Sequence, residues 1–281
     1  MVLRIFGASL RALLLAFVIC VPALLLPGAG ADTMQVVAFV ALFLAGLTVF
    51  EYSSVYPCLV EFRDAAPYNR IRFLVFFGLV ILLSLASIAP AVPSTFNRLL
   101  LALGHAFGGL LDFPYSPLRL LMQVLPAAAQ SRLGVLQSLA GLASMVCLTG
   151  IGAFLVAIHA LGWPNRQERF NVWVNLPTFD PTMGGDVVDR LRRDSWVNAS
   201  VGVVLPFLLP VLLKLVSIAF VSVMPRSPHA LIWLVILWAF LPTALVMRGM
   251  AMGRIAAMIA QRRRHARAEA EAGDDGTYQA A

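Results

Sequence analysis

The chain has 281 residues, of which 60% are hydrophobic and only 12% are charged, whereas charged residues make up about a quarter of a typical soluble domain. This composition excludes a soluble globular protein and predicts an all-α, polytopic membrane helix bundle, because a lipid-exposed backbone must satisfy its own hydrogen bonds. The net charge of +7 is spread over short connections and a tail, so we predict contacts with the lipid bilayer and other membrane proteins and none with nucleic acid.

The first three apolar stretches are each long enough to cross a bilayer core of about 30 Å as a helix. We predict spans from Ile5 or Ala12 to Leu26, from Met34 to Phe50, and from Phe73 to Val92. The first span has an alternative interpretation, because its basic start, its apolar stretch and the small residues "AGA" are typical of a cleaved signal peptide covering residues 1–31. Both interpretations leave the later helices in the same orientation.

Residues 93–130 are apolar, but prolines, glycines and two arginines interrupt them. Neither half crosses a bilayer comfortably, so we predict one or two helices in the outer interface, or a re-entrant segment. The stretch "GHAFG" at 104–108 has the GxxxG spacing that lets two helices approach closely, and so does "GMAMG" at 249–253. The fourth span follows, from Val135 to Ala160.

The connection at 164–198 is the longest soluble segment. Acidic residues four positions before basic ones predict a short helix from Gly185 to Trp196, with Asp186 paired to Arg190 and Asp189 to Arg193. Aromatic residues alternate with polar residues before this helix, which favours a loop at the membrane interface or against a partner protein. We predict either a docking loop or a purely structural connection. The docking candidates are Trp173, Phe179, Asp186, Asp189, Arg190 and Arg193.

The fifth span, from Ala199 to Met224, contains the only lysine of the chain. Lys214 is predicted near the bilayer midplane, where a lysine is expensive and is expected to face protein, water or a counter-charge. Four-residue spacing suggests one stripe for the members of this candidate intramembrane polar site, which are Gly202, Pro206, Pro210 and Lys214. The prolines remove two backbone donors, so the carbonyl groups of Gly202 and Pro206 are expected to need other partners.

The sixth span is predicted from Ala230 to Met247, which completes a bundle over residues 1–260. A basic and then acidic tail at 261–281 is predicted to be disordered. With both termini in the cytoplasm, the arginines that face outside are Arg98, Arg119, Arg132 and Arg226, and all others face inside. The positive-inside rule therefore favours about six transmembrane helices with both termini cytoplasmic.

The sequence does not indicate an enzyme, a cofactor or a metal ion, because it contains neither a GxSxG nor a Walker-type nor an HExxH motif. The abundance of arginine over lysine is typical of GC-rich bacterial genomes. We predict a non-catalytic accessory or assembly subunit of a complex in a bacterial cytoplasmic (inner) membrane. The alternative is a small-solute or ion transporter component that uses Lys214, and a third interpretation is a membrane-bound lipid-modifying enzyme.

Overall fold

The computed structural model describes residues 2–124, 133–164, 175–180, 182, 184–219 and 228–278, with side chains for 4–124, 133–164, 175–180, 182, 184–215 and 228–271. The described part of the chain is all-helical. Six of its helices are long and apolar enough to cross a membrane. The prediction of a multi-pass helix bundle is therefore confirmed. The side of the membrane on which the termini lie stays a prediction.

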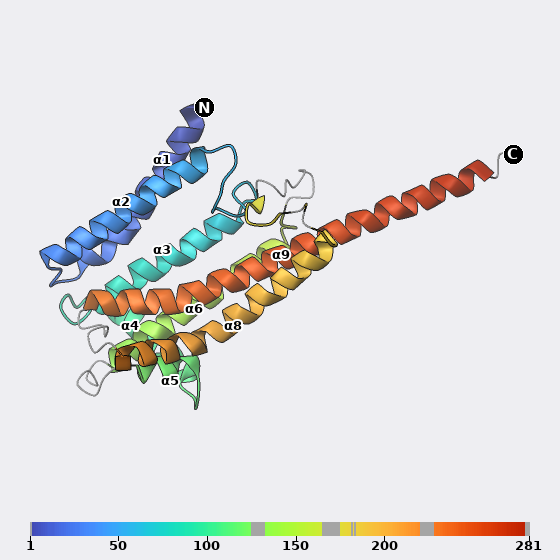
Figure 1. Ribbon diagram of the computed structural model, residues 1–281. Helices are drawn as coiled ribbons and strands as arrows, with labels where there is room; N and C mark the ends of the chain where they lie inside the picture. Colours follow the sequence, from blue (N-terminus) through green and yellow to red (C-terminus); the bar gives the residue numbers. More distant parts are fainter. Residues whose placement is uncertain are drawn as a thin grey trace.

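The six long helices form a hairpin and a larger bundle (Figure 1). The hairpin consists of α1 (Val2–Leu25) and α2 (Ala31–Ser53), and α2 contacts no described helix other than α1. The bundle consists of α3 (Tyr68–Ser87), α6 (Leu133–His159), α8 (Val187–Ala219) and α9 (Pro228–Tyr278). Because the crossings are even in number, both termini lie at the end of the molecule that contains Arg248. We call this the Arg248 end, and the opposite end the Pro228 end.

Two short helices occupy the region where the sequence predicts interfacial or re-entrant structure. They are α4 (Thr95–Leu111) and α5 (Pro117–Met122), and serine side chains cap both of their N-termini. At 17 residues, α4 is shorter than any of the spanning helices. It packs along α6. Whether α4 lies in the interface or re-enters the bilayer stays a prediction.

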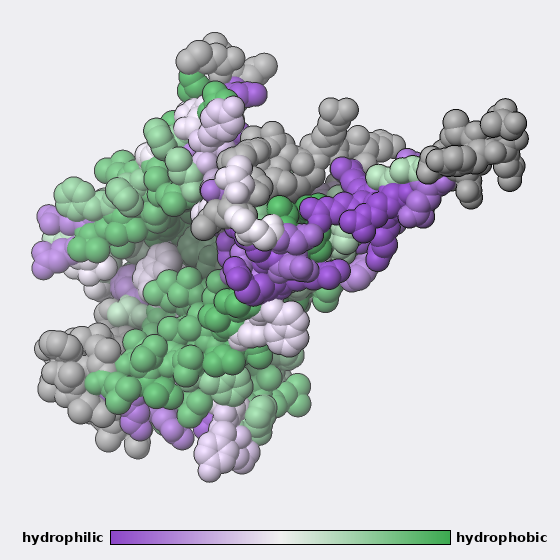
Figure 2. Space-filling view, turned by 45° about the vertical axis from the view of Figure 1, so that its right-hand side comes forward, coloured by the Kyte–Doolittle hydropathy of each residue, from purple (hydrophilic) through white to green (hydrophobic). Residues whose placement is uncertain are grey.

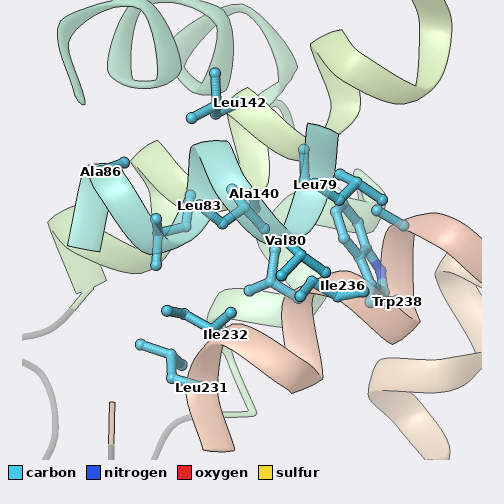
Figure 3. Close-up of a cluster of buried hydrophobic side chains, with 14 of the residues drawn as sticks. Leu79, Val80, Leu83, Ala86, Ala140, Leu142, Leu231, Ile232, Ile236 and Trp238 are labelled. Carbon is cyan, nitrogen blue, oxygen red and sulfur yellow. The ribbon is translucent and has the colours of Figure 1, made fainter. Parts of the chain in front are cut away.

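Leucine, valine and isoleucine side chains of α3, α6 and α9 fill the centre of the bundle (Figure 3). Leu79, Leu83 and Leu139 are fully buried there. Much of the outer surface of the hairpin and of α8 is apolar and exposed, and hydrophilic side chains gather on the distal part of α9 (Figure 2). This division is expected when the sides of a bundle face lipid and one end faces water.

Glycines of both GxxxG stretches lie where two helices approach each other closely. Gly104 and Gly108 of α4 meet Gly141 of α6, and a Cβ on any of the three would press into the facing backbone. Gly249 of α9 similarly faces Ser195 of α8, where a Cβ would lie 2.8 Å from the Ser195 carbonyl oxygen. Small residues allow backbones to approach in membranes, where packing rather than the hydrophobic effect drives helix association.

Two predicted boundaries differ from the structure because no helix breaker separates the segments concerned. The short helix predicted at Gly185–Trp196 and the described part of the fifth span form one continuous helix, α8, and residues 220–224 of that span lie outside the described residues. The sixth span continues past Met247 as α9 to Tyr278, through the tail predicted to be disordered. Alanine, arginine and glutamate dominate that tail and favour helix. Asp186, which directly precedes α8, holds the beginning of the tail through an ion pair of 2.7 Å with Arg263.

Candidate functional site

The four residues of the predicted intramembrane site do not share one face of α8. Gly202 and Pro210 are buried and Pro206 is half-buried, whereas Lys214 is exposed. The physical reason is helical periodicity. Four residues advance about 40° beyond one turn, so the three steps from Gly202 to Lys214 rotate the side chain by about 120°. The structure thus places the glycine and prolines against the bundle and turns the lysine outward.

A tryptophan of the neighbouring helix replaces one of the two backbone hydrogen-bond donors that the prolines remove. Pro210 has no N–H for the carbonyl group of Pro206, and the indole Nε1–H of Trp238 on α9 donates to that oxygen at 3.0 Å. The proline pair therefore helps to fix the α8–α9 interface. The sequence predicted the released carbonyl group but not its donor, because the donor lies 32 positions away.

A buried ion pair at the Arg248 end is the most elaborate polar arrangement in the described residues. Arg248 of α9 donates from Nε to Glu61 Oε2 at 2.6 Å and from Nη2 to Glu61 Oε1 at 2.7 Å. Thr178 also donates its hydroxyl to Glu61 Oε1, at 2.7 Å. The Glu61 side chain is only 8% exposed. A two-point pair of this kind is strong and geometrically specific.

The remaining contacts of this pair join separate segments of the chain. The second terminal nitrogen of Arg248, Nη1, donates to Asn198 Oδ1 on α8 at 2.7 Å, and Asn198 in turn donates to the Asp194 carbonyl oxygen. Asn69 donates to the backbone carbonyl oxygen of Glu61 at 2.7 Å. We call Glu61, Thr178, Asn198 and Arg248 the Arg248 clasp. The clasp connects the α2–α3 loop, the α6–α8 connection, α8 and α9.

Glu51, at the C-terminal end of α2, organises the loop that carries Glu61. Its buried carboxylate accepts the backbone N–H groups of Cys58, Leu59 and Val60 at 2.9–3.1 Å. Arg63 closes the same loop by donating to the carbonyl oxygens of Glu51 and Ser54. These bonds give the loop a defined backbone, which is what positions Glu61 beneath Arg248.

Four aromatic side chains form an apolar cluster next to the Arg248 clasp. The four rings belong to Phe62, Tyr68, Phe154 and Trp163, and each lies 4.5–6.1 Å from at least two of the others, measured between ring centroids. The Trp163 indole N–H donates to the Ala65 carbonyl oxygen at 3.0 Å. The aromatic cluster excludes water from one side of the clasp, and so strengthens its electrostatic interactions.

The predicted docking residues differ in how exposed they are. Phe179 is buried and stacks on the guanidinium group of Arg190, with 4.6 Å between the guanidinium carbon and the ring centroid. Asp189 and Arg193 are exposed, with side chains 77% and 73% accessible. Trp173 lies outside the described residues.

Both predicted i,i+4 ion pairs are replaced by other pairs. Asp186 pairs with Arg263 of α9, and Asp189 lies 4.0 Å from Arg192. Asp186 also caps α8 by accepting the Val188 N–H at 2.6 Å. This backbone bond, assisted by Arg263, lowers the pKa of the Asp186 carboxyl group. The sequence pattern identified the charges but not the partner, because α9 comes alongside only in the folded chain.

Sequence reasoning missed Glu61 and Arg248 as a pair. Arg248 was counted as a loop charge after the sixth span, and Glu61 was not considered. A usable signal exists in both stretches: "CLVEF" and "LVMRGMAM" each place one charge among apolar residues. Charged residues in such surroundings are usually paired when buried.

The clasp can hold segments together, but its geometry leaves little room for chemistry. Both Glu61 oxygens and three Arg248 nitrogens are engaged in hydrogen bonds. Within the described residues, no group of three or more His, Cys, Asp or Glu side chains is arranged to hold a metal ion. Comparison with protein-family models, curated proteins and solved structures finds no match.

Proposed function

We propose that the chain is a non-catalytic subunit of a complex in a bacterial cytoplasmic membrane, and that it holds a cytoplasmic partner protein. The observation that carries this proposal is the projection of α9 from the Arg248 end (Figure 1). From Arg248 to Tyr278 the helix extends about 45 Å at 1.5 Å per residue.

The distal part of this helix has no neighbour within the described residues. The last side-chain contact is the Arg263–Asp186 ion pair, and every side chain from Arg264 to Glu271 is exposed. We call residues 264–278 the α9 arm. Isolated helices of about 15 residues are only marginally stable in water, so a partner surface that packs against the arm would stabilise it.

The neighbouring surface of α8 supports the same function. Asp189, Arg192 and Arg193 are exposed on the first turns of α8, which follow directly after Asp186, the partner of Arg263. Together they present charges of both signs to a partner. Their position relative to α9 is fixed, because the Arg248 clasp joins α8 to α9. The docking surface therefore centres on the arm and this turn of α8, and less on the aromatic residues of the preceding connection.

Mild-detergent extraction followed by mass measurement tests the proposal. The full chain is expected to purify with a second protein in a fixed molar ratio that is the same in two detergents. A truncation that removes residues 264–281 is expected to purify without it, whereas the matched truncation of residues 279–281 is expected to retain it. Unchanged thermal unfolding of both truncated chains would show that the bundle itself is intact.

Two results would contradict the proposal. One is a full chain that purifies alone, and the other is a complex of unchanged composition after removal of the arm. Solute flux in liposomes that contain this chain as the only protein would instead support the transporter alternative.

A further inference from the structure

Three arginines surround one tyrosine at the Arg248 end, where the hairpin meets α3 (Figure 1). The guanidinium carbon of Arg11 on α1 lies 4.9 Å from the ring centroid of Tyr52, at the end of α2. The charges of Arg63 and Arg72 also act on the Tyr52 phenol. Arg63 belongs to the α2–α3 loop and Arg72 to the second turn of α3. We call Arg11, Tyr52, Arg63 and Arg72 the junction cluster.

Two of these arginines have no carboxylate partner in the part of the chain that the structure describes. No ion pair there includes Arg11 or Arg72. Arg11 donates one N–H to the Gly7 carbonyl oxygen at 2.7 Å. Arg72 is half-buried, and its charge acts on the phenols of Tyr52 and Tyr68. A phenol is a neutral group, whereas a charge removed from water is usually paired with an opposite charge.

Two carboxylates act on the same phenols, but both are already engaged. Asp64 pairs with Arg63 at 3.3 Å. Glu61 accepts hydrogen bonds at both oxygens within the clasp. The charges of Arg11 and Arg72 are therefore left to an anion from outside the chain.

The junction cluster lies at the level of lipid headgroups. Tyr52 is the last residue but one of α2, and Arg72 lies about 6 Å along the axis from the first residue of α3. Tyrosine is enriched where a membrane meets water. Two positions deeper in each helix, Phe50 is 60% exposed and Leu74 is 62% exposed. Acyl chains can therefore cover the surface next to the cluster while their headgroup reaches the arginines.

We propose that Arg11 and Arg72 bind the phosphate group of an anionic phospholipid where the hairpin meets the bundle. A guanidinium group presents paired N–H donors that match two oxygens of a phosphate. Basic sites between transmembrane helices suit acidic headgroups for this reason. A phosphate bound to both arginines joins α1 to α3, and so holds the hairpin against the bundle. The site does not involve the α9 arm, so this inference stands apart from the proposed function.

Binding of phosphatidylglycerol to the full chain in a neutral detergent tests the inference. Native mass spectrometry counts the bound lipids, and phosphatidylcholine serves as the competitor without net charge. About 0.5 M ammonium acetate reduces the Debye length to about 4 Å, which weakens diffuse attraction to exposed arginines. The first phosphatidylglycerol is expected to bind about five- to thirtyfold more tightly than phosphatidylcholine. This range corresponds to about 1 kcal/mol for each of one or two arginines.

Arg72→Gln and Arg11→Gln are each expected to weaken binding of the first phosphatidylglycerol about fivefold. The matched control is Arg70→Gln, which removes an exposed charge two positions away on the same helix and is expected to retain the binding. Thermal unfolding without added lipid shows whether each variant is folded. If Arg72→Gln does not fold, Arg11→Gln at its exposed position provides the test.

Equal binding of phosphatidylglycerol and phosphatidylcholine by the full chain would overturn the inference. So would an equal loss in Arg70→Gln and Arg72→Gln, which would assign the preference to the basic surface as a whole. Glycerophosphoglycerol, the same headgroup without acyl chains, is expected to compete poorly. Competition as strong as that of the lipid would assign the arginines to a soluble phosphate compound, and would also overturn the inference.

Discussion

The Arg248 clasp leads to the most demanding stability prediction. Replacing Arg248 with Met leaves the Glu61 carboxylate, 8% exposed, with the Thr178 hydroxyl as its remaining side-chain donor. Replacing Glu61 with Met leaves the guanidinium group of Arg248 beside apolar surface. Breaking a buried pair by removing one member costs about 3–5 kcal/mol. The Arg248 side chain is 28% exposed, so we expect the lower end, about 3 kcal/mol, for either single substitution.

The double substitution Glu61→Met/Arg248→Met is expected to unfold less readily than either single variant. It removes both charges together, and an apolar pair of similar volume is often neutral relative to a buried ion pair. Tryptophan fluorescence during thermal unfolding in detergent measures the effect. A loss of about 3 kcal/mol corresponds to a fall of roughly 6–12 °C in Tm for a chain of this size.

Comparing the three variants shows whether Glu61 and Arg248 stabilise the fold as a coupled pair. If the double variant loses as much Tm as the two single variants together, the two side chains act independently and the clasp is not an energetic unit. If each single variant shifts Tm by less than about 2 °C, the pair behaves like an exposed surface ion pair. Either result would refute the reasoning.

Three further predictions concern the helix contacts and the start of α8. Gly141→Val is expected to lower Tm by several degrees because its side chain would press into the backbone of α4, whereas the control Gly109→Ala, with no atom within 4 Å of the new Cβ, is expected to have no effect. Trp238→Phe is expected to cost about 1–2 kcal/mol because the Pro206 carbonyl oxygen loses its indole donor, and an unchanged unfolding temperature would contradict this. Because the pKa of the Asp186 carboxyl group is lowered, its contacts with α8 and α9 are complete above its ordinary pKa of 3.8 and are lost only as the pH falls through the lowered pKa. Distances between spin labels on the two helix ends are expected to broaden below that pH, and Asp186→Asn is expected to show the broad distribution at neutral pH too.

Local patterns were sufficient to predict the helices. Long apolar stretches lead directly to spanning helices, because a backbone in lipid has few other ways to satisfy its hydrogen bonds. The GxxxG stretches also indicated close contacts from local sequence alone. A glycine has no Cβ, so the backbone of any neighbouring helix can come close to it. The end of the sixth helix was missed because the loss of apolar character at Arg248 was taken as the end of the helix, although polar residues that favour helix continue it to Tyr278.

The sequence by itself determined that the chain crosses a membrane, roughly where each span lies, and that Lys214 is exceptional. Only the tertiary structure decided which charges meet: Glu61 with Arg248 across 187 positions, and Asp186 with Arg263 across 77. It also decided that Lys214 is exposed, whereas Pro210, four residues before it, is buried against the bundle. The reason is that spacing along a helix fixes only an angle about the helix axis, whereas the neighbour at that angle depends on how the whole bundle packs.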